Sequence, residues 1–443
     1  MKYLNILVEF PRYVLSDRVS LKKNFIWTLL ANVIYAGCQW GILTILVKIG
    51  TPEAVGRFSL GSAIATPIIM FAQLQLRMVQ ATDVRRRNAF YEYMIVRLML
   101  LSIALLIIIG LSFGHYQGIR AWVIFVFGLA KSIESLGDLY YGLFQQHERM
   151  DYVAQSKIIK GVLSFLFMGV IFFVSRSVLW GVVGLMFAWS ISWLMYDIPR
   201  SRSILLNRSD TLHLPELDSE ILQRLLRIVK VAMPLGLVKL LVSLNTTIPR
   251  YFVEEYWGEG ILGIFTAMTY IPVVGSIIVN ALAQVSIPRL AKYYMNKRSS
   301  AFASLFLKML AITIGIGIVS IGGVLLLGRE LLNILYTPEY AAYTSVFTWV
   351  MVSGGAKYLS AVFGAPVSAM QKFKVQFWIH GSGIAILGVL SYLLIPEHGM
   401  LGAVWAILVS DLFLVLGYSV VTFQGILYRN HKPGLISFDG KVR

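Results

Sequence analysis

The chain has 443 residues, of which 57% are hydrophobic and only 14% are charged, and its mean hydropathy is +0.73. A soluble domain carries roughly 25% charged residues, so this composition excludes a large soluble core and predicts an integral membrane protein. The net charge of +17 would indicate a nucleic-acid partner in a soluble protein. Here most cationic residues fall in loops on one side of the predicted membrane, and we expect no nucleic-acid partner.

Apolar segments of spanning length follow one another along the whole chain, since a membrane helix needs about 20 mostly apolar residues. The segments are residues 25–47, 58–80, 90–113, 119–143, 158–175, 178–198, 230–252, 260–288, 303–327, 342–370, 375–395 and 400–427. The fifth and sixth are separated only by Ser175–Ser177. The sequence therefore predicts an all-α polytopic membrane protein of about twelve transmembrane helices.

The distribution of Lys and Arg predicts the orientation of these segments, because cytoplasmic loops carry the excess of positive charge. With the N-terminus inside, most of the 39 Lys and Arg residues fall in inward segments. The outward loops contain only Lys48, Arg57, Arg120, Arg176, Arg250 and Arg329. An even number of crossings, with both termini in the cytoplasm, explains this asymmetry.

A hydrophilic stretch in the middle divides the chain into two halves of about six segments each. Ile221, Leu222, Leu225 and Leu226 recur there at helical spacing, which predicts an amphipathic helix at the membrane surface. The N-terminus lacks the pattern of a cleaved signal peptide. We expect a cytoplasmic interfacial arm at 1–24, a six-helix bundle at 25–198, a cytoplasmic amphipathic linker at 199–229, a second six-helix bundle at 230–427 and a cytoplasmic tail at 428–443.

Two short motifs recur in both halves. Glu53–Ser59 (EAVGRFS) opens the second segment, and Gly260–Thr266 (GILGIFT) opens the eighth, 207 positions later. GLAK at 128–131 recurs as GGAK at 354–357. Six crossings per half give both copies the same orientation, so we expect two pseudo-symmetric bundles related by an axis normal to the membrane. Transporters built from such repeats bind their substrate between the halves.

Lys131 and Lys357 close the second motif near the middle of the fourth and tenth segments. A lysine at the centre of a membrane helix costs about 2.5–3.5 kcal/mol, so it usually faces a bundle interior or an aqueous cavity. We expect the two lysines to bind an anionic group such as a pyrophosphate between the halves. The alternative for the fourth segment is an internal ion pair of Lys131 with Glu134 or Asp138 that locks helices together.

Five other charged residues lie within predicted segments and have open alternatives. Lys239 and Arg97 are further candidates for substrate binding, although either side chain could instead reach the cytoplasmic headgroups. Glu134 and Asp138 lie one helical turn apart, and two carboxylates that close favour binding a proton or a cation. Asp411, in the twelfth segment, is a third candidate for ion or proton coupling, and a structural hydrogen bond is its alternative role.

The sequence gives little support for an ATPase or for a membrane enzyme. The chain has no GxxxxGK[ST] loop, so we expect no ATP hydrolysis, and we expect neither a metal, a cofactor nor a catalytic residue. A membrane enzyme acting on lipid-linked sugars would need a sizeable outward loop with acidic or metal-binding residues. The outward loops are short, except near 328–342.

The run from Ser20 to Arg87 resembles the start of bacterial polysaccharide flippases. LKKN at 21–24, VGRFSL at 55–60 and LQLRMVQATD at 74–83 carry the resemblance. On these motifs the chain is similar to the Wzx-type exporters of O-antigen and exopolysaccharide repeat units. These exporters belong to the multidrug/oligosaccharidyl-lipid/polysaccharide (MOP) superfamily, and the twelve-span plan extends the resemblance over nearly the whole chain.

The resemblance implies two six-helix bundles around a cationic cavity that opens alternately to either side of the bacterial inner membrane. It implies an undecaprenyl-pyrophosphate-linked oligosaccharide as substrate, with the lipid tail among membrane lipids. It also implies a polysaccharide polymerase and a chain-length protein as partners of the chain. The family motifs assign no binding residue. The alternative function is a cation-coupled multidrug antiporter of the same superfamily, which would favour an acidic cavity.

Overall fold

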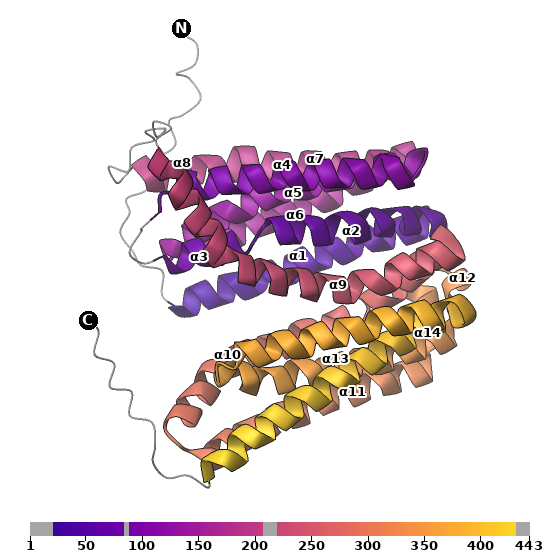
Figure 1. Cartoon of the computed structure of the whole chain (residues 1–443). Helices are drawn as coiled ribbons and strands as arrows, with labels where there is room; N and C mark the ends of the chain where they lie inside the picture. The colour runs from indigo at the N-terminus through magenta and orange to yellow at the C-terminus, as the bar shows by residue number, and fades with distance from the viewer. Residues whose placement is uncertain (1–20, 84–87, 207–218, 431–443) are drawn as a thin grey trace.

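The computed structural model of the chain describes residues 21–83, 88–206 and 219–430, and these residues form helices joined by short turns (Figure 1). Most of the predicted arm 1–24, the centre of the predicted linker 199–229 and most of the predicted tail 428–443 lie outside the described residues.

The helices of the first half are α1 (Leu21–Ile49), α2 (Pro52–Ala72), α3 (Leu76–Thr82), α4 (Phe90–His115), α5 (Ile119–Gln146), α6 (Met150–Ser175), α7 (Val178–Ser192), the π-helical turn η1 (Trp193–Asp197) and α8 (Ile198–Leu206). The helices of the second half are α9 (Ser219–Tyr270), α10 (Val273–Met295), α11 (Ser299–Leu335), α12 (Pro338–Ala341), α13 (Thr344–Ala369) and α14 (Phe373–Asn430). The predicted amphipathic segment around Ile221 forms the first turns of α9, which continues into the next membrane crossing.

Glycines turn the two longest helices back on themselves. α9 turns at Gly258, with φ of 80°, and α14 turns at Gly399, with φ of 56°. Glycine adopts positive φ readily because it has no Cβ. The indole Nε1 of Trp257 donates a hydrogen bond to the carbonyl oxygen of Ile395 at 2.8 Å, so the two turns lie next to each other. α9 and α14 therefore each consist of two arms.

Nine helical stretches among the described residues are long and apolar enough to cross a membrane. One of them, Lys374–Gln424, contains both arms of α14. The helix α5 and the first arm of α9 have spanning length but carry several charged residues. Counting both arms of α14 and adding these two helices gives twelve crossings. The prediction of an all-α protein with about twelve transmembrane helices is therefore confirmed.

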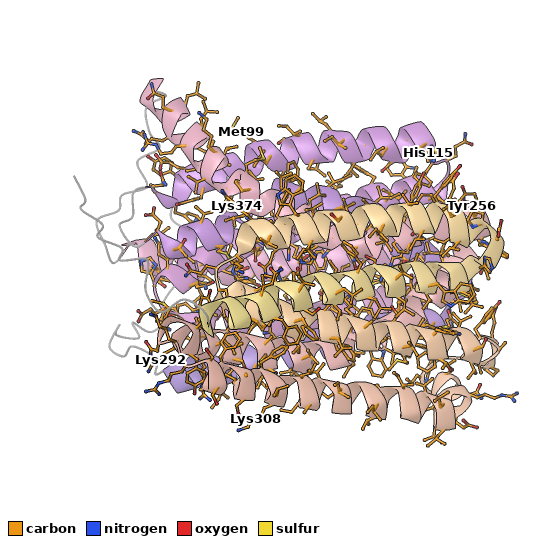
Figure 2. The ribbon with its side chains drawn as sticks, turned by 60° about the horizontal axis from the view of Figure 1, so that its bottom comes forward. Met99, His115, Tyr256, Lys292, Lys308 and Lys374 are labelled. Atoms are coloured by element: carbon orange, nitrogen blue, oxygen red, sulfur yellow. The ribbon has the colours of Figure 1, made fainter. Side chains whose placement is uncertain are left out.

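The two halves form separate bundles, with the long α9 between them (Figure 1). α9 makes the main contacts between the halves, through α2 above all. α1 begins and α14 ends at the same end of the molecule, opposite α12 (Figure 1). Figure 2 shows Lys292 and Lys374 towards one end and His115 and Tyr256 at the other. An even number of crossings produces this arrangement, and the cytoplasmic placement of the termini stays a prediction.

The outer faces of the bundles are apolar, as a hydrocarbon environment requires. On α4 the side chains of Leu98, Ile103 and Leu106 are exposed, the last by 69%. The opposite face of the same helix is buried in the bundle and carries Glu92 and Arg97 together with small, aromatic and apolar residues. Helix α4 therefore places a cation inside the bundle while an apolar surface faces lipid.

The first repeated motif packs against its own counterpart. The hydroxyl oxygens of Ser59 on α2 and Thr266 on α9 are 2.5 Å apart. A Cβ atom at Gly56 would collide with the carbonyl oxygen of Glu259, and one at Gly263 would collide with that of Pro52. Residues 207 positions apart thus exchange equivalent contacts, as the two sides of a two-fold interface do. The crossing of α2 and α9 lies on the pseudo-symmetry axis.

Candidate substrate site

The polar face of α5 carries an ion pair in the middle of the first bundle. Lys131 Nζ lies 2.7 Å from Glu134 Oε2, and the two side chains are 23% and 19% exposed. The same ammonium lies 5.2 Å from the centroid of the Trp189 ring on α7, within the range of a cation–π contact. The ion pair foreseen as an alternative therefore forms, although within one helix, and Lys131 keeps part of its surface free.

Glu134 is the point at which three helices meet. The hydroxyl of Tyr35 on α1 donates a hydrogen bond to Glu134 Oε1 at 3.0 Å. Lys160 Nζ on α6 lies 3.8 Å from the same oxygen and 5.0 Å from the centroid of the Tyr141 ring. Two lysines and a tyrosine thus surround one carboxylate, and this cluster holds α1, α5 and α6 together.

Asp138, one turn further along α5, has its own cation. Arg77 Nη1 on α3 lies 3.0 Å from Asp138 Oδ1. Arg97 Nη1 donates to Ser135 Oγ at 2.9 Å, and its side chain is fully buried between α4 and α5. Its Nε and Nη2 have no hydrogen-bond partner among the described residues. Glu134 and Asp138 thus have different cationic partners, and Arg97 lies inside the bundle.

The second half presents its lysines differently. Lys357 on α13 is exposed, and its side chain forms no ion pair or hydrogen bond with a described residue. The buried Asp411 of α14 lies within its electrostatic reach, and Asp411 Oδ2 has no hydrogen-bond partner among the described residues. Lys239, on the first arm of α9, is half-buried and also has no ion pair within the described part of the chain.

The sequence reasoning missed Lys160, and with it a polar side of α6. The predicted fifth segment begins at 158, and Lys157 and Lys160 lie so close to this boundary that they count toward an inward loop. The helix begins instead at Met150, and Lys160 is buried. Ser156, Lys160 and Ser164 recur at every fourth position, which is the spacing of one helical face and could have revealed this side.

Ion pairs join the two halves at the end of the molecule near α12. Arg57 Nε donates to Glu259 Oε2 at 2.9 Å. Arg120 Nε lies 2.7 Å from Glu259 Oε1 in an ion pair without hydrogen-bond geometry, and Arg120 Nη1 lies 3.7 Å from Glu254 Oε1. Both glutamates are almost fully buried. We call these four residues the clasp, because two arginines of the first half hold two glutamates of the second.

Two bundles of membrane-length helices with charged residues inside them define a polytopic membrane protein, and its fold is shared with solved structures of transporters. The structure of the lipid II flippase MurJ in an inward closed conformation matches with a TM-score of 0.73 at 11% identity, over 91% of this chain and 90% of that one. An inward-facing multidrug resistance MATE transporter of the MOP superfamily matches with a TM-score of 0.70 at 14% identity, over 90% and 94%.

The family follows from the sequence comparison. The polysaccharide biosynthesis protein family matches residues 21–294, and the chain belongs to that family. The capsular polysaccharide biosynthesis protein CapF of Staphylococcus aureus is 28% identical over 401 residues, which are 89% of this chain and 98% of the relative. The expected resemblance to polysaccharide transporters is therefore confirmed.

Proposed function

We propose that the protein is a flippase that moves an undecaprenyl-pyrophosphate-linked oligosaccharide repeat unit from the cytoplasmic to the outer leaflet. One observation carries the proposal: Lys357 lies exposed in the middle of a membrane-spanning helix without an ion-pair partner among the described residues. Exposed cations in a membrane protein face water or a ligand rather than lipid. Membership of the polysaccharide biosynthesis family supports a glycolipid as that ligand.

The charges of the two halves favour an anionic over a cationic substrate. In the first bundle the four cations Lys131, Lys160, Arg77 and Arg97 outnumber the three acids Glu134, Asp138 and Asp197. In the second bundle, the two cations Lys239 and Lys357 outnumber the buried acid Asp411. A pyrophosphate bound between Lys131 and Lys357 would gain two favourable charge interactions, with the sugar between the bundles and the lipid tail in the bilayer. Glu134, Asp138 and Asp411 remain the proposed positions for ion or proton coupling.

In alternating access, opening towards the outside would require the ion pairs of the clasp to break. The ribbons of the two bundles converge at the end near α12 and diverge towards the end where α14 terminates (Figure 1). With both termini in the cytoplasm, the clasp lies at the outer face of the inner membrane. Breaking the pairs of Arg57 and Arg120 would let the halves separate there. A polysaccharide polymerase and a chain-length partner would receive the released unit.

The second candidate function is a cation-coupled multidrug antiporter, and the fold shared with the MATE transporter favours it. The excess of lysine and arginine counts against it, because a cationic drug would be repelled. An enzyme acting on lipid-linked sugars is a third and weaker alternative.

Replacing both lysines tests the proposal. In vesicles containing the protein, the double variant Lys131→Ala and Lys357→Ala should lose translocation of a pyrophosphate-linked lipid oligosaccharide. Lys308→Ala, which removes an exposed lysine of α11, is the matched control and should transport normally. Transport that survives the double substitution would refute the assignment of the two lysines.

A further inference from the structure

A buried acid that the proposed transport mechanism does not use lies where α7 ends. Asp197 closes the π-helical turn η1 and is 2% exposed. Its Oδ1 atom has no hydrogen-bond partner among the described residues. Its Oδ2 atom lies against α5 at Gly137, where a Cβ would come within 3.2 Å. A buried carboxyl oxygen without a donor is costly, so a further species bound at Oδ1 would stabilise it.

The neighbours of Asp197 indicate what that species is. Lys160 and Ser156 of α6 and Tyr140 and Tyr141 of α5 lie within electrostatic reach of the carboxyl group. Tyr196 is the titratable neighbour in the same turn. Because the ammonium of Lys160 already faces the acid, a metal cation would be repelled. A proton on Oδ1 would not be, since it neutralises the carboxyl group and brings no further cation.

Asp197 ends a row of alternating charges. Lys131 pairs with Glu134 at 2.7 Å, Glu134 faces Lys160 at 3.8 Å, and Lys160 faces Asp197. Two cations thus balance two anions inside the bundle. Of the two lysines, Lys131 is 23% exposed and Lys160 only 7%, so Lys131 is the cation placed to leave this row. Once it leaves, Lys160 alone stands between two buried carboxylates.

We propose that Asp197 is a proton-binding site that takes up a proton from water when Lys131 turns from Glu134 to an anionic substrate. The proton adds to Oδ1 and restores the neutrality of the buried row, since an unbalanced buried charge is strongly disfavoured. Linkage is reciprocal, so a proton on Asp197 in turn favours the release of Lys131 to the substrate. The role of the substrate in this proposal rests on the proposed function, but the proton site itself does not.

Infrared difference spectroscopy of the purified full-length protein tests the site without any substrate. A buried protonated carboxyl group has its own C=O stretching band, which a pH titration follows. Lys131→Met imitates the departure of Lys131, so the pH at which the band is half-developed should rise by about one unit or more. Asp197→Asn should remove the band. Asp151→Asn, at an acid paired with Arg149 outside this row, is the matched control and should keep it.

The proposal fails if Asp197→Asn leaves the titrating band intact, or if Lys131→Met leaves its midpoint unchanged. Should Asp197→Asn not fold, Asp197→Glu replaces it, and a shifted band supports the proposal where an unshifted band refutes it. Loss of glycolipid transport is a separate measurement, so a failed proton site and a failed flippase assignment are distinguishable.

Discussion

Lys131 and Lys357 close the same short motif, GLAK and GGAK, in the two halves but differ in their partners. Lys131 Nζ lies 2.7 Å from Glu134 Oε2, whereas Lys357 is exposed and forms no ion pair with a described residue. The same motif therefore places one lysine in a balanced cluster and leaves the other available. This difference makes the two sides of the proposed pyrophosphate site unequal before substrate binds.

The unequal pairing predicts unequal effects of substitution. Lys357→Ala should weaken binding of a pyrophosphate lipid by about tenfold, which corresponds to about 1.4 kcal/mol. Lys131→Ala should have a smaller effect, because Lys131 must break its ion pair with Glu134 before it binds the lipid. Binding of a fluorescent pyrophosphate lipid in detergent measures both. Equal losses for the two variants would contradict the asymmetry.

Glu134→Gln should destabilise the protein. It leaves Lys131 without a carboxylate and removes one of the two carboxylates that Lys160 faces, and removing one partner of a buried ion pair typically costs about 3–5 kcal/mol. Thermal unfolding in detergent should show a clear loss of stability. The double variant Glu134→Gln with Lys131→Met should recover part of it, because the ammonium that lost its ion-pair partner is gone. No recovery would mean that Glu134 stabilises the bundle by some other contact.

Glu259→Gln should loosen the clasp, since Arg57 and Arg120 both pair with this carboxylate. In a Cys38→Ser background, a cysteine in place of the buried Ser59 should then react faster with a membrane-impermeant maleimide. Glu255→Gln, at the exposed neighbouring acid of the same arm, is the control and should leave the rate unchanged. An unaltered rate in Glu259→Gln would mean that the clasp does not keep this end closed.

The crossing of α2 and α9 predicts that two distant glycines behave alike. Leucine at Gly56 or at Gly263 would collide with the backbone of the other helix, so each should force the halves apart and impair transport to a similar degree. Gly110→Leu is the control, because a Cβ there meets nothing within 4 Å. The measurement is the rate of glycolipid transport by each of the three variants. A severe effect at only one glycine would argue against the pseudo-two-fold contact.

The repeat could be read from the sequence, but the contact between its copies could not. Gly56 and Gly263 match by position, yet nothing in a one-dimensional pattern says that α2 and α9 cross where they match. The lysines at 131 and 357 were found through the high cost of charge in a membrane. Lys160 and Asp197 were not, because each lies near the end of a hydropathy segment, where a charge is normally assigned to a loop. Their roles depend on α6 beginning at Met150 and on the π-helical turn η1.

Translocation of a labelled polyprenyl-pyrophosphate oligosaccharide in proteoliposomes, with and without a proton or sodium gradient, tests the flippase assignment most directly. We predict that the purified protein moves this lipid between leaflets and that the double variant Lys131→Ala and Lys357→Ala does not. Absence of any lipid movement by the wild-type protein, together with export of a cationic dye, would contradict the assignment and favour the antiporter.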